Sequence, residues 1–172
     1  MEYKKIGKMK TKMVKDKELE KLLHIVMQKY PELKEYTFSI RYNSLSDAYA
    51  LCIINCRRRK VDIEIDIDLK NESDILKIAA IASEISHIIK EKTLSLIPLG
   101  LGSYVEGLVY EMSTIYRNYD ERQTDIETIR RGFGEELLEL LKYCCEDLGN
   151  ERGRPEGLSM TEIEEILKCT PK

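Results

Sequence analysis

The chain has 172 residues, of which 34% are charged and 42% are hydrophobic, and its formal net charge is −3. This length and composition predict a soluble, folded domain with a hydrophobic core. The small negative charge gives no reason to expect nucleic acid as the main partner, and no apolar run is long enough to cross a bilayer. The Lys-rich residues 1–17 lack the apolar stretch of a secretory signal, so we expect a cytoplasmic protein with no membrane partner.

Residue usage adds two expectations. Isoleucine, lysine and glutamate are abundant, glutamine is rare and tryptophan is absent, which is typical of a thermophile. The five cysteines are odd in number and lack the paired spacing of zinc knuckles. They therefore predict neither a disulfide framework nor a four-cysteine zinc site, and we expect small buried side chains instead.

The N-terminal part of the chain predicts one helix followed by three strands. Apolar residues spaced by three and four between Asp16 and Tyr30 predict an amphipathic helix that ends before Pro31. Strand-like runs follow at 36–42, 48–56 and 61–69. The second run is almost continuously apolar and predicts a buried central strand. The third alternates aliphatic and acidic residues, which predicts a solvated acidic face. An antiparallel meander is the simplest arrangement.

The rest of the chain predicts helices. A strongly apolar stretch, capped by Asn71 or Ser73, predicts a buried helix to about Lys90. Further helices are expected at 104–116, 120–131, 134–147 and, after a capping box at Ser159 and Glu162, to Lys168. We expect an α+β fold, in which a small antiparallel or mixed three-stranded sheet packs on a central helix. The expected divisions are a basic tail and helix (1–35), the core (36–148), and a linker with a short helix (149–172).

The buried helix carries the pentapeptide Ser83-Glu84-Ile85-Ser86-His87. Histidine in place of Ser83 would make it H-E-x-x-H, the helix motif of zinc proteases. Residues four apart lie on one face of a helix, so two such histidines reach one zinc ion. The glutamate beside the first histidine then activates a water molecule.

A second motif, Glu121-x-x-x-Asp125, follows on a later predicted helix, where zinc proteases often place a third, carboxylate ligand. The two motifs and the order of elements resemble the gluzincin metallopeptidases, in particular the very small archaeal minigluzincins. The resemblance covers roughly residues 36–147 and implies a zincin-like fold. It implies that Glu84 matches the general base and that His87 and Glu121 match zinc ligands.

The resemblance implies three further assignments. Asp125 matches the acid that supports the first histidine, a position held here by Ser83. Residues 61–69 match the strand along the rim of the substrate cleft. A terminal segment plugs the cleft in some small relatives, and the segment after Gly149 is the candidate here.

Ser83 decides the expected chemistry. A hydroxyl is a poor zinc ligand, and two protein ligands fall short of the three that catalytic zinc normally has. We therefore expect no cofactor, or weakly bound zinc, and an inactive homologue (a pseudoenzyme) that binds a peptide or protein along the cleft or regulates a peptidase. The buried Asp125 would then need a partner, such as the Ser83 hydroxyl or the His87 ring.

Two alternatives stay open. In the first, a cysteine, His24 or a partner subunit completes the zinc site, and the protein is an active zinc-dependent peptidase. In the second, the protein is a nucleic-acid-binding module unrelated to peptidases, which uses residues 1–17 and the run Arg57-Arg58-Arg59. The acidic strand and the net charge count against the second alternative.

Overall fold

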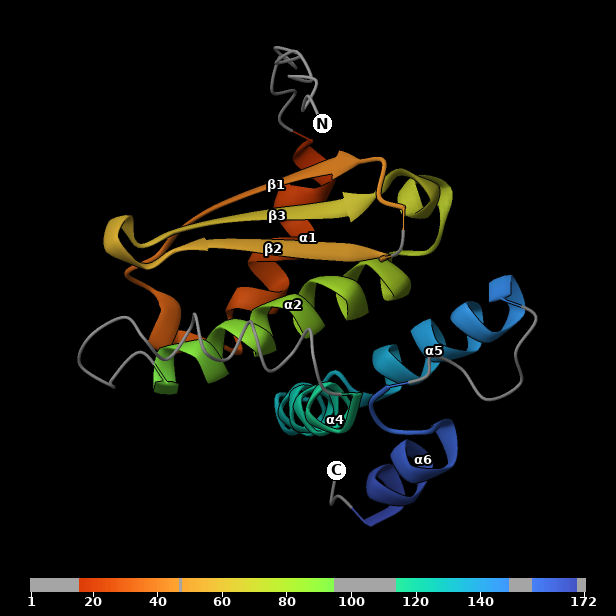
Figure 1. The fold of residues 1–172 in the computed structure, drawn as a ribbon. Helices are drawn as coiled ribbons and strands as arrows, with labels where there is room; N and C mark the ends of the chain where they lie inside the picture. The colour runs from red at the N-terminus through yellow and green to blue at the C-terminus, as the bar shows by residue number, and fades with distance from the viewer. Residues whose placement is uncertain (1–15, 47, 95–113, 149–155, 170–172) are drawn as a thin grey trace, which may run out of the picture.

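The computed structural model describes residues 16–46, 48–94, 114–148 and 156–169 of the chain. Within these ranges the protein is an α+β fold with a three-stranded mixed sheet and five helices (Figure 1). The expected fold class is confirmed at this level. None of the helices in these ranges is both long and apolar enough to cross a membrane.

The elements follow one another as a helix, the sheet and then helices. The helices are α1 (Lys17–Met27), α2 (Asp74–Leu94), α4 (Thr114–Arg130), α5 (Gly134–Leu148) and α6 (Met160–Cys169). The strands are β1 (Thr37–Asn43), β2 (Ala50–Asn55) and β3 (Lys60–Asp66). Short 3-10 turns are η1 (Pro31–Leu33), η2 (Cys56–Arg58) and η3 (Ile67–Asn71).

Strand β3 lies in the middle of the sheet, parallel to β1 and antiparallel to β2. The expected meander, with residues 48–56 in the centre, is therefore wrong. Burial explains the order: Ile63 and Ile65 of β3 are fully buried, whereas Leu51 and Ile53 of β2 are 44% and 51% exposed. A central strand is covered along both edges, so it takes the residues whose burial stabilises the fold most.

The expected solvated acidic face of residues 61–69 is wrong for Glu64 and Asp66, whereas Asp62 is half-buried and Asp68 is exposed. Glu64 and Asp66 are only 5% and 6% exposed. The parallel register places Arg41 opposite Glu64, and the Glu64 carboxylate accepts hydrogen bonds from Arg41 and Asn43. Burial raises the pKa of Glu64, but these hydrogen bonds outweigh it and hold the pKa below its usual value. Asp66 accepts from the Leu45 amide at 2.9 Å. Buried carboxylates are tolerated here because they are hydrogen-bonded.

The main core lies between one face of the sheet and helices α1 and α2 (Figure 1). Helix α1 has the expected amphipathic pattern, and its buried residues are Leu19, Leu22, Leu23 and Val26. Its first turn is capped by Asp16, whose side chain accepts from the amides of Glu18 and Leu19. Helix α1 thus shares its core with the sheet and with α2.

A smaller cluster joins α4, α5 and α6. Its buried members are Ile129, Leu137, Leu141, Leu158 and Ile163. The expected capping box opens α6: the Ser159 amide donates to Glu162 Oε2 at 2.8 Å, and the Glu162 amide donates to Ser159 Oγ at 3.3 Å. Two helix boundaries differ from expectation, because α2 continues to Leu94 and α4 begins at Thr114. The expected helix at 104–116 lies mostly outside the described residues.

The cysteines follow the expectation in part. Cys52, Cys144, Cys145 and Cys169 are free thiols. Cys144 is buried, Cys52 and Cys145 are half-buried, and Cys169 is exposed near the end of α6. The expectation of a small, buried cysteine side chain is therefore confirmed for Cys144 and is wrong for Cys169.

Candidate metal-binding site

The ring of His87 lies between two carboxylates at the contact of α2 with α4. Nδ1 is 3.7 Å from Asp120 Oδ2, and Nε2 is 3.7 Å from Glu121 Oε2. One ligand atom from each of the three residues lies within 4.8 Å of the other two. Their side chains are 27%, 11% and 15% exposed for His87, Asp120 and Glu121, so solvent reaches the site.

These donors fit a divalent cation. Zinc bonds of about 2.0–2.2 Å place tetrahedral ligands about 3.3–3.6 Å apart. The 3.7 Å between His87 Nε2 and Glu121 Oε2 is only slightly longer, so a small side-chain rotation would bring both atoms to one ion. An imidazole with carboxylates suits Zn²⁺, Mn²⁺ or Fe²⁺.

The motif residues lie on one unbroken helix, as expected. Ser83 is buried at 8% exposure, one turn before His87, and Glu84 beside it is half-buried. The structure therefore brings His87 and Glu121 together. His24, which was considered as a possible third ligand, is exposed on α1 and is not part of the group formed by His87, Asp120 and Glu121. We call this group of three side chains the metal cluster.

Asp125 lies one turn after Glu121 and is fully buried. Its Oδ2 accepts a hydrogen bond of 2.8 Å from the amide of Leu158, just before α6. The C-terminal segment thus supplies a partner that the sequence analysis did not foresee. A hydrogen bond from Ser83 to Asp125 stays a prediction.

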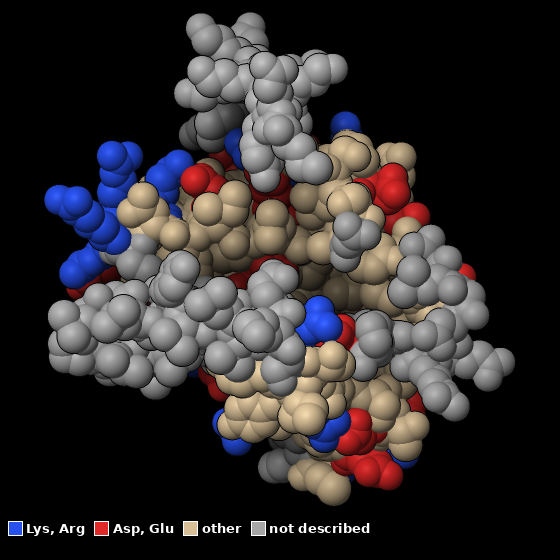
Figure 2. All heavy atoms as spheres, viewed as in Figure 1, with Lys and Arg blue, Asp and Glu red and all other residues tan. Residues whose placement is uncertain are grey.

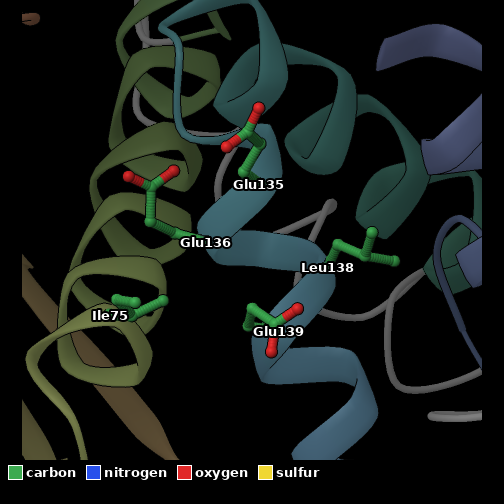
Figure 3. Close-up of a pocket in the computed structure, with 5 residues that line it drawn as sticks. All are labelled: Ile75, Glu135, Glu136, Leu138 and Glu139. Carbon is green, nitrogen blue, oxygen red and sulfur yellow. The ribbon is translucent and has the colours of Figure 1, made fainter. Parts of the chain in front are cut away.

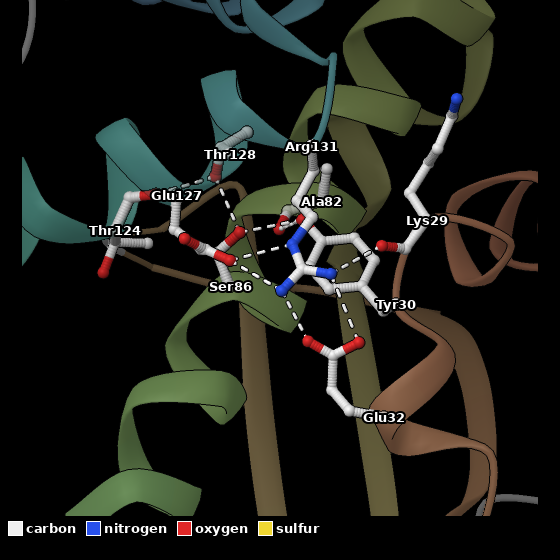
Figure 4. Close-up of polar contacts among 9 residues, drawn as sticks. All are labelled: Lys29, Tyr30, Glu32, Ala82, Ser86, Thr124, Glu127, Thr128 and Arg131. Atoms are coloured by element: carbon white, nitrogen blue, oxygen red, sulfur yellow. Dashed lines mark hydrogen bonds and ion pairs between the residues drawn. The ribbon is translucent and has the colours of Figure 1, made fainter.

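Buried hydroxyl groups lie close together where α2 packs against α4 (Figure 4). We call Tyr30, Ser86, Thr124 and Thr128 the hydroxyl seam; all four residues are fully buried. Ser86 Oγ lies 2.8 Å from the Tyr30 hydroxyl and accepts from Thr128 Oγ1 at 2.9 Å. Burial raises the pKa of Tyr30 to about 12, so the phenol keeps its proton. The buried Ser86 hydroxyl is therefore hydrogen-bonded inside the core.

The hydroxyl seam reaches the metal cluster through Thr124, whose Oγ1 lies 3.1 Å from His87 Nδ1. Neither Thr124 nor Asp120 was predicted from the sequence as a residue of this site. One sequence pattern could have identified them: the short polar residues Asp120, Thr124 and Thr128 are spaced by four, which predicts a polar stripe along one face of a helix. The stripe alone does not say which helix it faces.

Two other surface features lie apart from His87. A hollow between α2 and α5 is lined by Ile75, Leu138 and the glutamates 135, 136 and 139 (Figure 3). Ile75 is about three turns before His87, or about 18 Å along the helix axis. Arg57, Arg58 and Arg59 are exposed at the turn from β2 to β3. Figure 2 shows lysine and arginine side chains gathered at this end of the sheet.

Comparison of the chain with models of known protein families, with curated proteins and with solved structures finds no match.

Proposed function

We propose that the chain is a zincin-like metallopeptidase homologue that has lost catalysis and binds a peptide or protein along a cleft beside α2. The supporting observation is the approach of His87 Nε2 to Glu121 Oε2 at 3.7 Å between two helices. Ser83 occupies the position one helical turn before His87, where an active relative would carry its first zinc ligand.

The donor set explains the expected loss of catalysis. A bound zinc ion would act as a Lewis acid, and His87 and Glu121 would hold it. Ser83 offers only a buried hydroxyl as the next donor on the helix. Glu84 keeps the position of a general base, but it needs a polarised water to act on. We therefore expect weak metal binding and no peptide hydrolysis.

The peptide would pair with β2. The resemblance assigned the cleft strand to residues 61–69, but β3 is paired on both edges and cannot accept another strand. Strand β2 contacts α2 and pairs, as far as the described residues go, with β3 alone. An edge strand binds an extended peptide through its backbone N–H and C=O groups.

A second candidate is an active zinc-dependent peptidase, and the observation that favours it is Asp120. This carboxylate belongs to the metal cluster and is 3.7 Å from His87 Nδ1. Turned towards the Nε2 side, it would supply the third ligand in place of a cysteine or His24.

Zinc content separates the two candidates. The purified protein, the Ser83→His variant and the Asp120→Asn variant are loaded with zinc and desalted. We expect the native chain to retain well under one equivalent and Ser83→His to retain about one. A full equivalent in the native chain that Asp120→Asn removes would instead favour the active enzyme, and peptidase assays would follow. Absence of zinc from both the native chain and Ser83→His would overturn the zincin-like interpretation.

Hydrogen exchange tests the peptide part of the proposal. A pool of unstructured peptides should slow exchange of amides in β2 and leave those of α5 unchanged, because only β2 gains backbone hydrogen bonds. Unchanged exchange in β2 at saturating peptide would rule out pairing at this edge.

A further inference from the structure

We infer that Thr124 sets the tautomer of His87, so that Nδ1 carries the ring proton and Nε2 presents its lone pair to a ligand. The inference rests on the proposed metal site and names the atom through which His87 binds there. Thr124 is a positioning residue in this scheme, since it acts on the ligand only through His87.

The Thr124 hydroxyl has a single proton to donate. Thr124 Oγ1 donates to the backbone carbonyl of Asp120 at 3.1 Å. With its proton used, the oxygen can only accept from His87 Nδ1, which lies at 3.1 Å. The Nδ1 atom must then be an N–H.

The next turn of α4 has a similar arrangement of a threonine hydroxyl and a helix carbonyl. Thr128 repeats the geometry one turn later: its Oγ1 lies 2.9 Å from the carbonyl oxygen of Thr124 and 2.9 Å from Ser86 Oγ, and its single proton serves one of these two acceptors. A threonine inside a helix commonly bonds the carbonyl four residues earlier. Both threonines are fully buried, which keeps bulk water from competing for their protons.

The carboxylates around His87 do not choose between its nitrogens. Asp120 Oδ2 and Glu121 Oε2 each lie 3.7 Å from one ring nitrogen, so their electrostatic effects on the two positions are closely matched. Thr124 contacts Nδ1 and therefore breaks this balance. In neutral histidine, the hydrogen bond made by one nitrogen decides which nitrogen remains free to bind a metal.

The consequence is a ring with two distinct sides. Nε2 and Glu121 Oε2 face each other as two electron-pair donors, an arrangement that a cation between them stabilises. On the other side, Asp120 Oδ2 lies 3.7 Å from Nδ1, which carries the proton in this scheme. The inference therefore places Glu121 among the ligands and keeps Asp120 outside them.

Nitrogen NMR of the metal-free protein tests the tautomer directly. The chain has two histidines, and the exposed His24 provides an internal reference. At about pH 8.5, where an ordinary histidine is neutral, long-range proton–nitrogen correlations show which ring nitrogen carries hydrogen. We expect Nδ1–H for His87 in the native chain and in Thr124→Ser, and a shift towards Nε2–H in Thr124→Val.

Thr128→Val is the matched control, because Thr128 is equally buried and no hydrogen bond of its side chain involves His87. It should leave the tautomer of His87 unchanged. Protonated Nε2 in the native chain would overturn the inference, and so would a tautomer that Thr124→Val does not alter.

Zinc affinity provides the second readout, measured on the Ser83→His background. Thr124→Val should weaken binding by about 10–100-fold, and Thr124→Ser should restore it. An unchanged affinity in Thr124→Val would count against a positioning role. Failure of every variant to bind zinc, with the expected tautomers present, would remove the proposed function and still support the control of the tautomer by Thr124.

Discussion

Helix α4 presents different polar chemistry to its two neighbours. Towards α2 it places the fully buried hydroxyls of Thr124 and Thr128, next to the partly exposed carboxylates of Asp120 and Glu121. Towards the segment that leads into α6 it places an asparagine, an arginine and an aspartate. We call these contacts of Asn118, Arg122 and Asp125 with residues 157–162 the C-terminal clasp. Within the clasp Asn118 accepts from the Gly157 amide at 3.0 Å, and Arg122 donates to Glu162 at 2.7 and 3.1 Å.

The two interfaces show how a helix can bury polar groups by different means. A threonine hydroxyl satisfies its proton on its own helix and still accepts from a neighbour, so it tolerates complete burial. A charged group needs a partner or water. The Arg122–Glu162 pair accordingly keeps 37% and 40% of its side chains exposed, and the buried Asp125 accepts the Leu158 amide.

The largest expected effect tests whether apolar packing, rather than the clasp, holds α6 in place. Ile163 is fully buried in the smaller apolar cluster. Ile163→Ala should lower the free energy of unfolding by about 3 kcal/mol, through lost burial and the cavity that remains. Urea titration measures this change. Ile166→Ala, at a half-buried position, is the control and should cost less. Similar losses in both variants would argue against this ranking.

The next effect concerns the buried carboxylate of the clasp. Asp125→Ala should cost about 2 kcal/mol, because the Leu158 amide loses its acceptor in the protein interior. Asp125→Asn keeps an oxygen acceptor and should cost less. The measurement is the midpoint of thermal unfolding for both variants. Equal stabilities of Asp125→Ala and the native chain would mean that water readily replaces the carboxylate.

A smaller effect is expected in the hydroxyl seam. Tyr30→Phe removes the phenol that contacts Ser86 and donates to the Ala82 carbonyl. We expect a loss of about 1 kcal/mol, because the carbonyl keeps its helical hydrogen bond. Tyr36→Phe, at a half-buried tyrosine outside the seam, serves as the control in urea titration. A loss above about 3 kcal/mol would show that the seam is coupled more strongly than pairwise hydrogen bonds imply.

The smallest effect is a pH dependence of the clasp. The Arg122 guanidinium and the hydrogen bonds of Ser159 lower the pKa of Glu162 from 4.5 to about 2. A carboxyl whose pKa is lower in the folded protein stabilises it above pH 4.5, and the contribution is lost as the pH falls towards 2. The pair is well exposed, so we expect less than about 1 kcal/mol.

Glu162→Gln isolates this contribution. The difference in unfolding free energy between the native chain and Glu162→Gln should shrink as the pH falls from 4.5 to 2. Glu164→Gln, at an exposed glutamate on the same helix, is the matched control and should show less change over this range. A difference for Glu162→Gln that stays constant with pH would show that the ion pair does not contribute.

Local sequence patterns determined much of this protein. The spacing of apolar residues predicted α1, the capping box at Ser159 and Glu162 predicted the start of α6, and the motif residues from Ser83 to His87 lie on one helix as expected. These features depend on backbone periodicity and on contacts within about one helical turn, so they can be identified from neighbouring residues alone.

Tertiary structure decided the strand order and the surroundings of the site. Strand β3 lies in the centre of the sheet, between β1 and β2. Its Glu64 is hydrogen-bonded to Asn43 of β1, a contact that the alternation of residues in the sequence did not predict. Asp120 and Thr124 came to lie beside His87, and Leu158 became the partner of Asp125. Each of these contacts joins residues far apart in the chain, so each depends on how whole elements compete for burial and hydrogen bonds.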